Sequence, residues 1–227
     1  MDVAVVGTGY PEIIGLLDDL CATNKELNFI GFLDDNPNNN RRTLYGKKII
    51  GKLNWIKKHK DVYIINSIFW DPYCREQVTL KLKEFGAKFF TFVHPSSSYN
   101  YASIGQGSII CRNCTLEPGV IIGEQSVVLH NAVISHDSKI GKYNFIGNNV
   151  TIQGKNLIGD YVTISAGSST CPNCEIVDGS LIGINSFINK NIPERSILGS
   201  PPSRIIKTNQ KFPELNKYIN WFRLNIK

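Results

Sequence analysis

The chain has 227 residues, of which 42% are hydrophobic and 19% charged, so it can bury one large or two small cores and is not a disordered polypeptide. No apolar run reaches the roughly 18 residues of a membrane span, and the start MDVAVVGTGY lacks a basic n-region and a small-residue cleavage site, so we expect a cytoplasmic protein without a membrane anchor. The net charge of +6 comes mainly from residues 191–227, where seven Lys and Arg stand against two Asp and Glu, and the nearly neutral remainder argues against nucleic-acid binding.

Residues 1–98 are predicted to form a Rossmann-like α/β domain. Buried-strand runs occur at 3–6, 29–33 and 62–65, and a helical pattern occupies 13–20, which together predict a βαβ unit with a parallel sheet. A further helix is expected over 72–85 and a further strand over 88–93. His94-Pro95 then marks a hinge into the next domain.

A nucleotide site is predicted at the edge of this domain. The turn Gly7-Thr8-Gly9 follows the first strand, and Asp34 and Asp35 follow the second. Such an arrangement lets helix N-terminal amides meet a phosphate while a carboxylate meets a ribose or base. The third glycine of a dinucleotide fingerprint is missing, so we favour a single nucleotide or a nucleotide-sugar, with a purely structural turn as the alternative.

Residues 99–206 carry a six-residue repeat. Aliphatic side chains recur at every sixth position from Ile104 to Ile188, and Thr170 is the only exception in this series. Each hexapeptide makes a short strand and a turn, with one aliphatic residue pointing inward, and three hexapeptides close one triangular coil. The repeat therefore predicts a left-handed parallel β-helix of about five coils.

A short amphipathic helix is expected to close the chain within residues 207–227. Leu215, Tyr218, Ile219 and Phe222 recur at the spacing of one helix face. The basic segment 191–227 at the end of the prism is also expected to meet the phosphates of a cofactor through Arg204 and Lys207, a hypothesis based on its charge.

His136 is the candidate general base. Residues eighteen apart stack vertically in such a prism, so His136 lies over Gly154 and then Pro172, with open space around its ring. Asp137 follows and could orient the imidazole or raise its basicity. His130 instead stacks in a crowded polar row, His94 is assigned a structural role, and an exposed His136 without a role is the alternative.

No metal site is predicted. The pairs Cys111/Cys114 and Cys171/Cys174 resemble zinc ligands in spacing. They are sixty residues apart, which is more than three coils, so they lie on different faces and about 16 Å apart along the prism. Cys114 and Cys174 occupy positions of small buried residues.

These features together resemble a known family, the bacterial sugar acyltransferases with hexapeptide repeats. The family includes sialic acid O-acetyltransferases and N-acetyltransferases of UDP-, dTDP- or GDP-linked 4-amino sugars, of the bacillosamine-pathway type. The similarity extends over about residues 1–206. It is carried by the hexapeptides and by the segments Phe32-Leu33-Asp34-Asp35, His94-Pro95, Val133-Ile134-Ser135-His136-Asp137 and Ile197-Leu198-Gly199-Ser200-Pro201-Pro202-Ser203-Arg204.

The resemblance implies a homotrimer with active sites between subunits, acetyl-CoA as co-substrate and a nucleotide-sugar on the N-terminal domain. His136 matches the family's general base and Asp137 its acidic neighbour. The residues implied on the substrate side are Gly9, Tyr10, Asp34, Asp35, Asn66 and Ser67, and those implied along the cofactor are Phe145, Gly154, Ala166 and Ile184.

The expected function is direct acetyl transfer from acetyl-CoA to the amino group of a nucleotide-linked 4-amino-deoxy sugar. An O-acetyltransferase of a sugar hydroxyl, such as that of sialic acid, is the nearest alternative. A nucleotide-binding trimeric scaffold without catalysis is the alternative from another class. A prism-shaped carbonic anhydrase would need three histidines where the coils hold two, and a nicotinamide oxidoreductase would need the missing third glycine.

Overall fold

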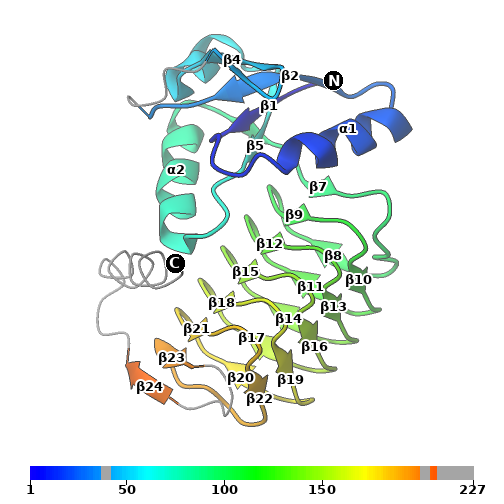
Figure 1. The fold of residues 1–227 in the computed structure, drawn as a ribbon, viewed down its shortest axis with the longest axis vertical. Helices are drawn as coiled ribbons and strands as arrows, with labels where there is room; N and C mark the ends of the chain where they lie inside the picture. The colour runs from blue at the N-terminus through cyan, green and yellow to red at the C-terminus, as the bar shows by residue number, and fades with distance from the viewer. Residues whose placement is uncertain (37–41, 200–204, 209–227) are drawn as a thin grey trace.

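The structure, a computed structural model that describes residues 1–36, 42–199 and 205–208, begins with a six-stranded sheet in the order β3-β4-β2-β1-β5-β6 (Figure 1). Strand β3 adds an antiparallel edge to five parallel neighbours. The elements of this α/β unit are β1 (Asp2–Val6), α1 (Ile13–Thr23), β2 (Asn28–Leu33), β3 (Thr43–Leu44), β4 (Lys47–Gly51), the 3-10 helix η1 (Leu53–Lys58), β5 (Tyr63–Asn66), α2 (Pro72–Glu84) and β6 (Lys88–Phe89).

Local sequence explains the main elements of this unit. The apolar run of β1 is buried on both faces, as expected of a central parallel strand. Helix α2 begins at Pro72 because the Asp71 carboxylate accepts the Cys74 N–H at 3.0 Å and proline fixes the first helical φ. The strands and helices expected from the sequence between residues 3 and 85 are present with small shifts at their ends, whereas the β3–β4 hairpin and η1 were not expected.

The prism follows as short strands, all of two residues except β23 with three, stacked in three parallel sheets (Figure 1). Paired strands are eighteen residues apart, as in Thr115↔Val133, so each coil contains three hexapeptides. The strands are β7 (Phe92–Val93), β8 (Ser103–Ile104), β9 (Ile109–Ile110), β10 (Thr115–Leu116), β11 (Ile121–Ile122), β12 (Val127–Val128), β13 (Val133–Ile134), β14 (Lys139–Ile140), β15 (Phe145–Ile146), β16 (Thr151–Ile152), β17 (Leu157–Ile158), β18 (Thr163–Ile164), β19 (Ser169–Thr170), β20 (Glu175–Ile176), β21 (Leu181–Ile182), β22 (Phe187–Ile188) and β23 (Ser196–Leu198).

In most of these strands, the side chain of the second residue points into the interior of the prism. These aliphatic side chains form one continuous core, in which Ile146 and Ile164 are fully buried and Thr170 takes an equivalent position. Many turns place their third residue in the left-handed region, for example Asn131 and Asp137 with φ near 58° and 59°. Asn, Asp and Gly tolerate this conformation best, which explains why they recur in the turns.

Three columns of turns form the corners of the prism. The α1 corner comprises 111–114, 129–132, 147–150, 165–168 and 183–186; the α2 corner comprises 105–108, 123–126, 141–144, 159–162 and 177–180; and the distal corner comprises 117–120, 135–138, 153–156 and 171–174. Asp19 of α1 binds Arg112 at 2.7 Å, and Glu76 of α2 accepts the Tyr161 hydroxyl at 2.6 Å. The two helices of the α/β unit thus lie against the first two corners.

One hydrophobic cluster contains residues of both the α/β unit and the prism. Ile13, Leu16 and Leu17 of α1 belong to the same buried cluster as Val127 and Phe145 of the prism. The expected strand over 88–93 is divided in two, because β6 pairs with β5 while β7 pairs with β9. The prism sheet therefore begins before the expected boundary at residue 99.

At the far end, β24 (Ile205–Thr208) pairs antiparallel with β23 and crosses the expected boundary at residue 206. Arg204 and the expected helix around Leu215, Tyr218, Ile219 and Phe222 lie outside the described residues. Among the helices that the structure describes, none is long and apolar enough to span a bilayer. The α/β fold followed by a left-handed parallel β-helix is confirmed.

Candidate active site

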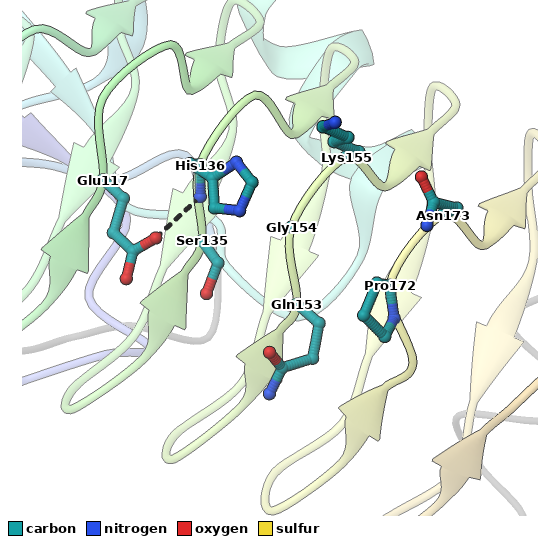
Figure 2. Close-up of a pocket in the computed structure, with 8 residues that line it drawn as sticks. All are labelled: Glu117, Ser135, His136, Gln153, Gly154, Lys155, Pro172 and Asn173. Carbon is teal, nitrogen blue, oxygen red and sulfur yellow. Dashed lines mark hydrogen bonds between the residues drawn. The ribbon is translucent and has the colours of Figure 1, made fainter.

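His136 lies in the turn between β13 and β14, at the distal corner of the prism. The turn borders a pocket of about 440 Å³ (Figure 2). The turn stacks on the turns one coil away, as the eighteen-residue register predicts. Lys155, which follows Gly154, donates its backbone N–H to the carbonyl of His136, and Asp137, which follows His136, donates its backbone N–H to the carbonyl of Pro118. The pocket is lined by Glu117, Ser135, His136, Gln153, Gly154, Lys155, Pro172 and Asn173.

The His136 ring is oriented by the next residue. Its Nδ1 lies 3.0 Å from Oδ2 of Asp137, and the left-handed backbone of Asp137 turns that carboxylate back toward the imidazole. Because an ionised carboxylate can only accept, this contact places the ring proton on Nδ1 and leaves a lone pair on Nε2. Nε2 is therefore the atom able to take a proton from a substrate.

Gly154 makes room for this ring. A Cβ at position 154 would lie 2.7 Å from Nε2 and 2.9 Å from Cε1 of His136, closer than Cβ atoms come to non-bonded heavy atoms. The imidazole thus lies across the glycine of the next coil, as Figure 2 shows. The open space inferred from the sequence around His136 is present, with Pro172 further along the same column.

Glu117 is a pocket residue that the sequence reasoning missed. Its Oε2 accepts the backbone N–H of His136 at 2.8 Å, drawn as the dashed line in Figure 2. The signal was available, because Glu117 precedes Ser135 by one coil and so stands beside His136 in the stacked turns. Counting back eighteen residues from every turn residue near His136 would have found it.

The predicted substrate-side residues gather at the carboxyl edge of the N-terminal sheet. Gly9 faces open space, since a Cβ there would meet nothing within 4 Å. The Asp34 carboxylate accepts from the Thr8 hydroxyl and, at 2.8 Å, from the Asn36 N–H. This edge is where parallel α/β sheets hold ligands, because strand ends and helix N-termini meet there.

Asp35 is engaged within the protein. It accepts the Leu53 N–H at 2.8 Å and pairs with Lys81 at 2.8 Å. Partial burial acts to raise the pKa of Asp35, but the hydrogen bonds from Lys81 and Leu53 outweigh it, and the net pKa is lowered. Asp35 therefore stays ionised.

Asn66, Ser67 and Tyr10 also make internal contacts. The Asn66 amide donates to the Thr79 hydroxyl at 3.0 Å and to the carbonyl of Arg75, so it anchors α2. The Ser67 hydroxyl contacts the carbonyls of Val6 and Gly7.

Tyr10 packs on Phe69 with ring centroids 4.2 Å apart, and its hydroxyl donates to Glu12 at 2.9 Å. Burial, with the neighbouring Cys111 and Glu12, raises the pKa of the phenol. The Tyr10 hydroxyl therefore stays protonated.

The predicted cofactor residues do not form one surface within the chain. Ala166 and Ile184 lie at the α1 corner, where Ile184 is 51% exposed, while Gly154 lies at the distal corner beside His136. Phe145 points outward from β15 but is only 3% exposed, because the loop before α2 lays Trp70 over it at 5.1 Å between ring centroids. Sequence periodicity could place Phe145 on the outer face, but it could not show this cover.

His136 and the substrate-side residues also lie at different corners. The α/β unit contacts the α1 and α2 corners, and none of the residues that line the His136 pocket comes from that unit. The structure thus brings His136, Asp137 and Gly154 together, and brings Gly9, Tyr10 and Asp34 together, but it does not join the two groups in one chain.

The remaining histidines and cysteines have structural surroundings. His94 is 5% exposed and contacts Asp19 at 3.2 Å, and His130 lies 2.8 Å from Glu12, with its pKa lowered chiefly by burial. All six cysteines are free thiols, and burial raises the pKa of Cys114 to about 11. Within the described ranges, no group of three or more His, Cys, Asp or Glu is placed to hold a metal ion.

The hexapeptide repeats of the prism can be compared with known protein families. Residues 119–154 match the family model described as bacterial transferase hexapeptide (six repeats). A search of curated proteins finds no match. The expected resemblance to bacterial acyltransferases with hexapeptide repeats is confirmed by this match and by the solved structures that share the fold.

Several solved structures share the whole arrangement. Perosamine N-acetyltransferase from Caulobacter crescentus, in complex with CoA and GDP-perosamine, is 17% identical with a TM-score of 0.81, covering 91% of this chain and 97% of that one. The acetyltransferase domain of PglB from Neisseria gonorrhoeae, in complex with acetyl coenzyme A, is 21% identical with a TM-score of 0.80, covering 90% and 98%. WeeI from Acinetobacter baumannii is 20% identical with a TM-score of 0.67, covering 91% and 100%.

Proposed function

We propose that this protein is an acetyl-CoA-dependent N-acetyltransferase that acts on the amino group of a UDP-, dTDP- or GDP-linked 4-amino-deoxy sugar in the cytoplasm. The observation that carries the proposal is the His136–Asp137 pair, held over Gly154 in a pocket on a hexapeptide prism that follows an α/β nucleotide-type domain. The similar structures that contain CoA, acetyl-CoA or GDP-perosamine support the choice of co-substrate and acceptor.

The chemistry follows from the orientation of His136. The acceptor arrives as an ammonium and loses one proton to solvent, and the neutral nitrogen attacks the thioester carbonyl. As the C–N bond forms, Nε2 of His136 takes the second proton while Asp137 stabilises the imidazolium through Nδ1. A backbone N–H stabilises the tetrahedral oxyanion, the C–S bond breaks, and the proton passes from Nε2 to the leaving sulfur.

A homotrimer with shared active sites forms part of this proposal. His136 occupies the corner that its own α/β unit leaves uncovered, whereas Gly9, Asp34, Ala166 and Ile184 lie at or near the other side of the prism. A second copy of the chain would bring its substrate-side groups to the His136 corner of the first. In that arrangement one subunit supplies the base and its neighbour supplies the nucleotide site.

The direct test is thiol release from acetyl-CoA with a panel of amino-sugar nucleotides. His136→Ala should lower kcat at least about a hundredfold, the lower range for loss of a general base, with little change in acetyl-CoA affinity. His59→Ala is the matched control, because it also removes an imidazole, but one that lies in the α/β unit and stacks on Trp55 with ring centroids 3.5 Å apart. Near-normal turnover in the His136 variant would show that another group is the base, and release only with hydroxyl acceptors would favour O-acetylation.

A mixing experiment tests the shared site. His136→Ala and Asp34→Asn chains should each be weakly active, and trimers that contain both should regain activity, because some interfaces then combine an intact His136 with an intact Asp34. Size measurements in solution would establish the oligomer. If mixed assemblies form but stay as inactive as the separate variants, each site lies within one chain.

A further inference from the structure

Glu117 is the carboxylate among the residues that line the His136 pocket. It follows β10 at the rim of the distal corner, and its backbone N–H donates to Ile134 at 2.9 Å. One carboxylate oxygen accepts the His136 N–H, and the other points away from this bond in Figure 2. Across the residues that the structure describes, no Lys, Arg or His forms an ion pair with Glu117.

The other two charged side chains near His136, those of Asp137 and Lys155, do not place a negative charge beside its reacting nitrogen. Asp137 is already directed at Nδ1 of His136, on the side of the ring away from the reacting nitrogen. Lys155 is the only cationic side chain among the lining residues, and it pairs with neither acid. A partly buried carboxylate without a counter-ion is stabilised by a cation that enters beside it.

The acceptor differs from its hydroxyl counterpart in carrying such a cation. An alkyl amine on a sugar is largely protonated near neutral pH, whereas a hydroxyl is neutral. Hydrogen bonds to charged groups are stronger than those between neutral groups. A carboxylate fixed next to the general base would therefore hold an ammonium group at the place where its proton must leave.

We propose that Glu117 is the residue that makes the site specific for an amine, binding the acceptor's ammonium group through its free oxygen while its other oxygen holds the His136 turn. The proposal rests on the proposed function and extends it from the base to the choice of acceptor. It assigns Glu117 two separable tasks, since only the first needs a negative charge.

Glu117→Gln separates these tasks. The amide oxygen can still accept the His136 N–H, so the turn should keep its place, but the charge is lost. The amine preference should fall about ten- to hundredfold, seen as weaker binding of the amino-sugar nucleotide while its 4-hydroxy counterpart binds as before. The KM for acetyl-CoA should not change. Calorimetric titration without acetyl-CoA measures this preference independently of turnover.

Two further variants complete the test. Glu117→Ala also removes the contact to the turn, so kcat should fall as well, and Gln should restore it relative to Ala. Glu84→Gln, which removes an exposed carboxylate at the end of α2, should change neither affinity nor kcat.

The possible results separate the two proposals. Acetyl transfer to an amine by the wild type, with an unchanged amine preference in Glu117→Gln, overturns the role of Glu117 and leaves the proposed function standing. Transfer only to hydroxyl acceptors, or to none of the nucleotide-sugars, overturns both. A preference lost in Glu117→Gln but equally lost in Glu84→Gln would reflect overall charge and would also overturn the role of Glu117.

Discussion

The close approach of the His136 ring to the backbone of Gly154 provides a sharp test of the site. Replacing Gly154 with Ala should disable the base without disturbing the fold. The new Cβ would lie 2.7 Å from Nε2, while non-bonded heavy atoms need about 3.5 Å, so the imidazole must withdraw by roughly 0.8 Å or rotate away. A displacement near 1 Å at a reacting group can reduce turnover about a hundredfold, or about 2.7 kcal/mol of barrier.

Stability should not follow activity in this variant. Gly154 does not adopt the left-handed backbone, and the group that the Cβ meets is the end of a half-exposed side chain, which can rotate about its χ angles. Gly→Ala at a compatible position stabilises a protein by about 0.4–1 kcal/mol through the unfolded chain. The thermal midpoint of Gly154→Ala should therefore equal or exceed that of the wild type, while kcat in the thiol-release assay falls.

The double variant with His136→Ala is the control. If Gly154→Ala acts only by moving the ring, adding it to His136→Ala should cause little further loss, because the group it displaces is already absent. A double variant that is another hundredfold slower would mean that the methyl group blocks the acceptor instead. Wild-type kcat in Gly154→Ala alone would refute the assigned position of the imidazole.

Two further predictions concern the contacts between the α/β unit and the prism. Arg75 is 1% exposed and donates to four backbone carbonyls, two of them in the prism. Arg75→Met should therefore lower the free energy of unfolding, measured by denaturant titration, by about 3–5 kcal/mol. A loss below about 1 kcal/mol would contradict the role of Arg75 in joining the α/β unit to the prism. Hydrogen bonds from Arg112 and His94 lower the pKa of Asp19 in the folded protein. The contribution of Asp19 to stability is therefore fully present above its pKa in the unfolded chain, about 3.9, and is lost as the pH falls through its pKa in the folded protein. The difference in thermal midpoint between wild type and Asp19→Asn should therefore be constant near neutral pH and vanish in acid; an undiminished difference at about pH 2 would contradict the pairing.

The sequence by itself determined the prism and the place of the base. A strict six-residue period gives each coil eighteen residues and points one aliphatic side chain of each strand into the prism. That register alone places His136 over Gly154, as the structure has it. The βαβ unit was equally readable, because buried parallel strands are continuous apolar runs.

Contacts between distant segments were decided only by the tertiary structure. Periodicity assigns Phe145 to an outer face, yet Trp70 covers it, and Asn66 ends a strand at the ligand edge, yet its amide is bound to α2. Nothing in the pattern says which corners the α/β unit contacts, since a regular prism offers three similar columns of turns. Packing of α1 on Val127 and Phe145 and burial of Arg75 made that choice, and left the corner of His136 uncovered.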